Sequence, residues 1–203
     1  RPVPFVPTPH QGGRIEPTLI VVHDTADQPD PHDTVRWFQN PKSKVSAHFV
    51  VARDGAITQM VACDRAAWHA GKSSWRGRQS CNGFSIGIEI DNTGRLLRRG
   101  DEAVAWFGGG WPLDELVEMR SEAHGHGWWL PYTDAQVGAV RELIIALSRA
   151  YPTIKEVAAH WEISPGRKID TGPHFPLAEC KVLLANRAPS TLVDVRWVPP
   201  HAR

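Results

Sequence analysis

Short apolar runs separated by proline, glycine and charged residues recur along the chain and predict alternating strands and helices. The run TLIVV at 18–22 is β-branched and uninterrupted, which is typical of a buried strand. A second such run, FSIGIEI at 84–90, carries one carboxylate, Glu89, among apolar residues. Residues 45–61 contain two apolar runs joined at an Asp-Gly dipeptide, which favours a tight turn and therefore predicts a hairpin.

Helical periodicity is clearest at 133–151, where Thr133 and Gln136 form a capping box and a proline follows the last residue. The apolar positions of this segment fall on one stripe: Val137, Val140, Leu143, Ile144 and Leu147. Two shorter helices are predicted at 32–39 and 176–186, each preceded or opened by proline. These helices supply apolar faces that can cover a sheet.

Three segments depart from this alternation. Residues 1–17 are proline-rich and predict an arm that extends over the surface, and residues 187–203 predict an extended tail. Between them, 18–186 forms one domain, in which 92–131 predicts a long loop or a subdomain laid over one side, with a short helix at 114–122. Four tryptophans in this insertion (106, 111, 128 and 129) either form a rim that holds substrate or cover the core.

Composition narrows the classes of function. The chain has 203 residues and a net charge of +1 without basic runs, so no nucleic-acid partner is expected. No apolar run approaches the roughly 20 residues of a membrane span, and no leader is visible. Cytoplasmic synthesis is therefore expected, with action in the cytoplasm or on the cell envelope. The three cysteines are too few and too scattered for a disulfide framework, and the oligomeric state is left open.

Candidate chemistry gathers in the loop AHWEISPGRKIDTGP at 159–173, which holds His160, Lys168 and Asp170. Its spacing matches no compact zinc signature, so a third ligand is needed, and His23 at the end of the first strand is the candidate. Two imidazoles, one carboxylate and an open fourth position make a hydrolytic zinc site. Glu89 could then move a proton, and Lys168 could stabilise a negative oxygen.

Other histidines allow more than one interpretation. His48 lies in a predicted strand and is expected to be packed or to support a ligand, rather than to bind metal itself. Trp68 and His69 stand beside small residues in AWHAG, where they either line a ligand cleft or form a hydrogen-bonded corner of the core.

Five motifs occur in the order TLIVVHDTA, VSAHFVVARDGAITQMV, AAWHAG, CNGFSIGIEI and AHWEISPGRKIDTGP, from about Thr18 to about Leu184. Together they closely resemble the zinc N-acetylmuramoyl-L-alanine amidases of the type 2 amidase family, a superfamily that includes a phage lysozyme and the peptidoglycan recognition proteins. The resemblance implies an α/β (α+β) single domain with a mixed central β-sheet flanked by helices. It also implies one Zn²⁺ ion and cleavage of the amide between N-acetylmuramic acid and the L-alanine of the stem peptide.

The resemblance carries site residues onto matching positions. It implies three zinc ligands, His23, His160 and Asp170, a catalytic glutamate, Glu89, and a transition-state lysine, Lys168. Trp68 and His69 fall in the motif that lines the substrate cleft. The insertion and the tail depart from compact enzymes that recycle anhydro-muropeptides, so both a soluble muropeptide and polymeric peptidoglycan remain candidate substrates. A non-catalytic peptidoglycan-binding module is the alternative, and the presence of Asp170 argues against it.

Overall fold

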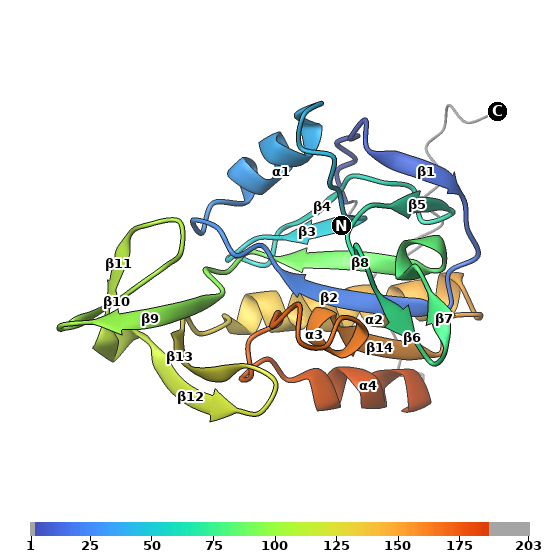
Figure 1. The fold of residues 1–203 in the computed structure, drawn as a ribbon. Helices are drawn as coiled ribbons and strands as arrows, with labels where there is room; N and C mark the ends of the chain where they lie inside the picture. The colour runs from blue at the N-terminus through green and yellow to red at the C-terminus, as the bar shows by residue number, and fades with distance from the viewer. Residues whose placement is uncertain (1–2, 187–203) are drawn as a thin grey trace.

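The computed structural model describes residues 3–186, which are built on a five-stranded sheet of order β14-β2-β8-β3-β4 (Figure 1). Strand β2 (Leu19–Asp24) lies between β14 (Glu156–Ala159) and β8 (Ser85–Ile90), and all three are parallel. Strand β3 (Phe49–Val51) is parallel to β8, whereas β4 (Ile57–Gln59) is antiparallel to β3. The mixed sheet confirms the predicted fold class, and the β3-β4 pair confirms the predicted hairpin.

Side-chain alternation gives this sheet two buried faces. In β2, Ile20 and Val22 pack in the main core with α2, whereas Leu19 and Val21 pack on the opposite face. Because the alternation continues along the strand, His23 falls on the face of Leu19 and Val21. The chemistry-bearing side chain of β2 therefore lies on the face away from the main helical layer.

Helices α2 (Asp134–Ala150) and α4 (Leu177–Asn186) cover one face of the sheet, and α1 (Pro31–Gln39) packs near β3 at the other side (Figure 1). These elements confirm the three predicted helices. The predicted capping box of α2 is present, with Thr133 Oγ1 accepting from the backbone N–H of Gln136. A short helix, α3 (His160–Ile163), follows β14 directly.

The insertion at 92–131 forms a second sheet of order β11-β10-β9-β13-β12, projecting from one end of the molecule (Figure 1). Its strands are antiparallel: β9 (Arg95–Arg99), β10 (Glu102–Val104), β11 (Gly110–Pro112), β12 (Val117–Ser121) and β13 (Gly125–Trp129). The predicted helix at 114–122 is wrong, because only a 3-10 turn, Leu113–Glu115, precedes β12. In VEMRS, partly exposed and exposed residues alternate with a period of two, which fits a strand and not a helix.

The remaining elements are short. Within the predicted extended arm, β1 (Gln11–Arg14) pairs with β5 (Arg65–Ala67), a strand pair that the proline content did not reveal. A small hairpin of β6 (Ser74–Trp75) and β7 (Arg78–Gln79) precedes a 3-10 turn at Cys81–Gly83. The predicted tail at 187–203 lies outside the described residues. Among residues 3–186, no helix has the length and apolar character to cross a membrane.

Candidate metal centre

Three side chains predicted as ligands converge at the carboxyl end of the parallel strands. His23 is the last residue but one of β2, His160 follows β14, and Asp170 lies in the loop after α3. The Nδ1 atoms of His23 and His160 are 2.9 Å apart, and Asp170 Oδ2 lies 2.9 Å from His160 Nδ1 and 3.4 Å from His23 Nδ1. Among the described residues, this is the group whose ligand atoms could hold one metal ion.

The outer ring nitrogen of His160 lies between an acceptor and a donor. His160 Nε2 is 3.3 Å from the backbone carbonyl oxygen of Ala70, which can only accept a hydrogen bond, and 3.3 Å from Nη2 of Arg167, which can only donate one. Metal binding at Nδ1 would require the proton on Nε2, and the carbonyl of Ala70 is placed to accept it.

A chain of hydrogen bonds fixes the tautomer of His23. Ser85 Oγ donates to the carbonyl of Cys81 at 2.6 Å, so it accepts from His69 Nε2 at 3.2 Å. His69 Nδ1 must then accept from His23 Nε2 at 2.9 Å, which leaves a lone pair on His23 Nδ1. His69, for which the sequence left a cleft or a core corner open, orients His23 through this hydrogen bond and also lines the cavity that contains His23 and Glu89.

The fit to zinc follows from these donors. Two imidazole nitrogens and one carboxylate oxygen face each other at 2.9–3.4 Å, an arrangement that a cation between them would suit. Ligands about 2.0–2.1 Å from a tetrahedral zinc ion are separated by about 3.3 Å, which is close to the observed spacings. Burial lowers the pKa of His23 to about 4, so its imidazole is neutral and able to bind metal at neutral pH. The residues present therefore fit zinc.

The carboxylate of Asp170 stays ionised despite its burial. Burial alone would raise its pKa, but the imidazoles of His160 and His23 that face it outweigh that effect and hold the pKa well below its usual range. A charged carboxylate is the form that a metal ligand requires.

Close packing also restrains His69. The ring lies against Gly87 of β8, where a Cβ atom would come within 2.5 Å of His69 Cγ. Only glycine allows the imidazole to approach the strand this closely. The space left by Gly87 therefore helps to set the position of His69, and through it the orientation of His23.

The loop that carries Asp170 is held by residues that the sequence analysis did not select. Asp24 Oδ2 accepts from the backbone N–H of Gly172 at 2.9 Å, and Asp24 Oδ1 accepts from Tyr132 Oη at 2.6 Å. Burial raises the pKa of Asp24 to about 7, although the hydrogen bond from Tyr132 acts in the opposite direction. Asp24 could have been selected from the sequence, because it is a polar residue directly after His23 at the end of a buried strand. Nothing in the sequence pattern indicated Tyr132.

Arg167 and Lys168 differ in their partners although they are adjacent. The Arg167 guanidinium donates to the carbonyls of Ala70 and Lys72 at 2.8 and 3.1 Å, which ties the segment after His69 to the metal loop. Lys168 Nζ has no hydrogen bond or ion pair to any residue among 3–186, and Lys168 lines the cavities beside Asp170. Its ammonium group is available to a bound molecule.

Glu89 lies beside His23 on the neighbouring strand. The two residues are directly paired in the parallel register of β2 and β8, on the same face of the sheet. Glu89 lines a cavity together with His23 and His160. Burial, and next the charge of Asp170, raise the pKa of Glu89 well above its usual value. A carboxyl group with a raised pKa can both accept and return a proton near neutral pH.

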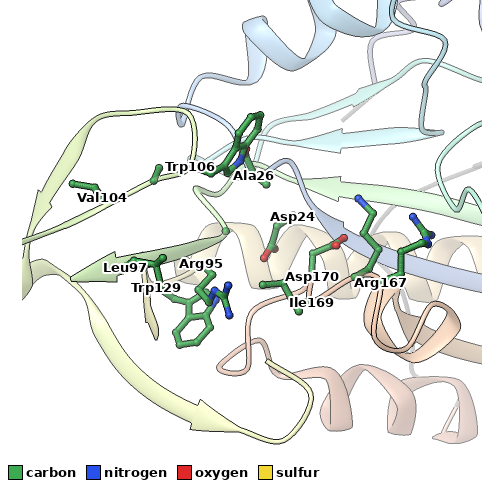
Figure 2. Close-up of a pocket in the computed structure, with 13 residues that line it drawn as sticks. Asp24, Ala26, Arg95, Leu97, Val104, Trp106, Trp129, Arg167, Ile169 and Asp170 are labelled. Atoms are coloured by element: carbon green, nitrogen blue, oxygen red, sulfur yellow. The ribbon is translucent and has the colours of Figure 1, made fainter. Parts of the chain in front are cut away.

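Two cavities flank the three candidate ligands. The first, of about 340 Å³, lies between the inserted sheet and the loop at 167–170 (Figure 2). The second, of about 300 Å³, lies toward α1 and contains Trp37, Trp68 and Glu89 in its wall. Trp68 therefore lies in the wall of the second cavity. Asp24, Ala26, Lys168 and Asp170 contribute to both cavities.

His48 is a packed histidine, as expected from its strand position. Its Nδ1 accepts from the backbone N–H of Gly87 at 3.0 Å, and its Nε2 donates to the carbonyl of Arg65 at 2.9 Å. Both ring nitrogens are used in joining β3 to its neighbours, and neither faces the metal centre.

The inserted sheet is anchored next to the metal centre at two points. Trp106 Nε1 donates to the carbonyl of Ala26 at 3.0 Å, and His124 Nε2 donates to the carbonyl of Thr171 at 2.8 Å. Of its four tryptophans, Trp129 is buried, Trp111 and Trp128 pack on the insertion's own core, and only Trp106 is exposed. Trp106 and Trp129 line the first cavity, whereas Trp111 and Trp128 cover the core of the insertion.

Comparison with known proteins agrees with this arrangement. Residues 13–173 match the family model Amidase_2, described as N-acetylmuramoyl-L-alanine amidase. The chain therefore belongs to this family of amide hydrolases.

Among its relatives, the 1,6-anhydro-N-acetylmuramyl-L-alanine amidase AmpD of Escherichia coli is 33% identical, over 89% of this chain and 91% of that protein. The amidase AmiD of the same organism is 32% identical over 87% of this chain, which spans 61% of AmiD. A solved AmiD structure in complex with anhydro-N-acetylmuramic acid-L-Ala-D-γ-Glu-L-Lys has a TM-score of 0.61 and 28% identity, covering 91% of this chain and 62% of that one.

Proposed function

We propose that this protein is a zinc-dependent N-acetylmuramoyl-L-alanine amidase that hydrolyses the amide between N-acetylmuramic acid and the L-alanine of the stem peptide. The observation that carries the proposal is the convergence of His23, His160 and Asp170, with Glu89 on the same face of the sheet. The relatives support the choice of bond, because they are named as amidases of muramyl-L-alanine compounds.

Each residue has a defined task in this reaction. His23, His160 and Asp170 would hold the zinc ion, which when bound polarises the scissile carbonyl and makes water more acidic. Glu89 accepts the proton of the attacking water and then donates it to the leaving amine of L-alanine, a role that suits its raised pKa. Lys168, whose ammonium group has no partner among residues 3–186, donates a hydrogen bond to the negative oxygen of the tetrahedral intermediate.

Positioning residues complete the site. His69 and Ser85 orient His23, and Asp24 holds the backbone at Gly172 so that the Asp170 carboxylate stays directed at the two imidazoles. A metal ligand that is orientated by a second hydrogen bond loses less freedom when the ion binds.

Product analysis tests the proposal. Zinc-loaded and chelator-treated protein is incubated with intact peptidoglycan sacculi and with purified anhydro-muropeptide, and the products are identified by mass spectrometry. Free stem peptide with an amino-terminal L-alanine, released only with zinc, is the expected result, and the rates on the two substrates show which is preferred. No release from either substrate, together with retained binding to sacculi, would instead identify a recognition module without catalysis.

The Glu89→Gln variant separates chemistry from metal binding. It keeps the size and polarity of the side chain but removes the basic carboxylate, so turnover should fall by about 10²-fold or more while one zinc per chain is retained. His160→Ala is the matched contrast and should lose both zinc and activity, as measured by metal analysis. A fully active Glu89→Gln enzyme would remove Glu89 from the mechanism.

A further inference from the structure

The loop that carries Asp170 is fixed at three consecutive residues by hydrogen bonds to its backbone. The groups involved are the carbonyl oxygens of Asp170 and Thr171 and the N–H of Gly172. Their partners are the N–H of Trp161 at 2.9 Å, Nε2 of His124 at 2.8 Å and Oδ2 of Asp24 at 2.9 Å. Trp161 and Asp24 directly follow candidate ligands in the sequence, whereas His124 lies in the turn between β12 and β13 of the insertion (Figure 1).

The turn itself directs the donor of His124 at this loop. The carbonyl of Thr171 can only accept a hydrogen bond, so Nε2 of His124 carries a proton. In the neutral ring, Nδ1 then accepts from Ser121 Oγ at 2.6 Å. The same Oγ accepts from the backbone N–H of His124 at 3.2 Å, which ties the side chain to its own turn. The position of the Nε2 donor is therefore set within the insertion.

The ring of His124 also packs against the other ligand-bearing segment. It is 5% exposed, and its centroid lies 5.4 Å from that of Trp161 in an edge-to-face arrangement. Trp161 follows His160 in the sequence, and Thr171 follows Asp170. One side chain of the insertion thus contacts residues adjacent to two of the three candidate ligands.

The loop has little room to replace a lost hydrogen bond. Thr171 is 1% exposed. Trp129 of the insertion covers the next residue so closely that a Cβ on Gly172 would lie 2.8 Å from Trp129 Cδ1. A buried carbonyl that loses its donor is costly, so without His124 the loop would shift to bring this carbonyl to water. Asp170, which is joined to it by one peptide bond, would move as well.

We propose that His124 is a positioning residue for Asp170, and that the inserted sheet thereby sets the zinc affinity of the metal centre. This inference rests on the zinc site of the proposed function. His124 acts through the backbone of Thr171 and is not itself a ligand. A carboxylate that is held in place before the ion arrives loses less freedom when it binds. The insertion is therefore part of the metal centre as well as an addition to one end of the fold.

Two substitutions of His124 test the hydrogen bond separately from the packing. His124→Phe keeps a planar ring beside Trp161 but removes both nitrogens. The zinc Kd, measured by competition with a chromophoric chelator, should rise about tenfold. His124→Gln can place its amide nitrogen near the position of Nε2 and should recover most of the affinity. Wild-type affinity in His124→Phe, or equal losses in both variants, would overturn the proposal.

Hydrogen exchange provides a readout that needs no metal. Because the N–H of Trp161 donates to the carbonyl of Asp170, its exchange rate reports the placement of the loop. In metal-free protein, His124→Phe should exchange severalfold faster at Trp161, and His124→Gln should stay near the wild-type rate. Amides of the buried face of α2, such as Leu143, report global unfolding and should be unchanged. An unchanged rate at Trp161 would show that His124 does not position the loop.

His126→Phe is the matched control, because it removes an imidazole from the same part of the insertion. His126 is exposed and its Nε2 lies 2.7 Å from Glu118 Oε1, within the inserted sheet. This variant should bind zinc as tightly as wild type. An equal loss of affinity would assign the effect to the stability of the inserted sheet and overturn the role of His124.

The wild-type protein separates this inference from the proposed function. Zinc binding that depends on His124, without release of stem peptide from either substrate, would refute only the amidase. Zinc-dependent hydrolysis with no effect of His124→Phe on zinc affinity would refute only the positioning role. A wild-type protein that binds no zinc would refute both.

Discussion

At the residue scale, one fixed acceptor, the carbonyl of Cys81, decides which nitrogens of His69 and His23 carry protons. The result is a lone pair on His23 Nδ1 at the site where the ligand atoms converge. His69 is not a ligand, but its hydrogen bonds to Ser85 and His23 fix which nitrogen of His23 carries the proton. The protonation of this site is therefore set by the backbone as much as by its own side chains.

His48 makes stability depend on pH. Burial lowers its pKa to about 4 in the folded protein, whereas the unfolded chain titrates at the ordinary value of about 6.5. As pH falls from 6.5 toward 4, the unfolded state takes up a proton that the folded state does not, so the free energy of unfolding should fall by up to about 3 kcal/mol. Urea unfolding of the metal-free protein at pH 7 and pH 4 measures this change.

His48→Gln is the control for that measurement, because glutamine can still accept and donate but does not titrate. The variant should lose the part of the pH dependence that comes from His48, with the contributions of His23 and His69 unchanged. An identical pH dependence in wild type and variant would show that the pKa of His48 is the same in the folded and unfolded states.

The sequence predicted individual site residues unevenly. His23, His160 and Asp170 could be selected because imidazole and carboxylate side chains follow strand ends or lie in a turn-rich loop. Asp24 and Tyr132 were not selected, since their contact joins residues 108 apart and leaves no local pattern. Pairwise contacts of this kind depend on the assembled fold.

At the scale of elements, the strands and helices with strong periodicity were predicted correctly, whereas the strands of the insertion were not predicted. Strand β12 has partly exposed and exposed residues in alternation, and charged side chains at 118 and 120 weaken its apolar signal. The short strands of this sheet are stabilised by pairing with β9 and β13 rather than by local propensity. A short stretch of sequence does not show which strands will pair.

Thr133 joins the start of α2 to the β3-β4 hairpin. Its Oγ1 accepts from the N–H of Gln136 at 3.0 Å and donates to the carbonyl of Arg53 at 2.6 Å. Thr133→Ala removes both contacts and should lower the free energy of unfolding by about 1–2 kcal/mol. Thr133→Ser, which keeps the oxygen, should lose much less in the same denaturant titration. Equal losses would assign the effect to the methyl group and not to the cap.

At the scale of the whole molecule, zinc binding should stabilise the fold. At a free zinc concentration of about 100 Kd, linkage adds about 2.7 kcal/mol, which corresponds to a Tm increase of about 5–10 °C for a chain of this size. Calorimetry with and without chelator measures the shift. Asp170→Asn should abolish it, whereas Asp27→Asn, which alters a nearby carboxylate outside the ligand group, should retain it. A full shift in Asp170→Asn would exclude Asp170 as a ligand.

The pairing of β14 with β2 has a consequence for the order of assembly. His23 and His160 are 137 positions apart in the sequence. They meet only when β14, near the end of the chain, pairs with β2, near its start. Closing so long a loop costs entropy that the ligands alone do not offset in an unfolded chain. During synthesis, a nascent chain in which residues 156–170 have not yet been made has no complete site. Tight zinc uptake should therefore mark the end of folding, after the first and last strands of the parallel array have joined.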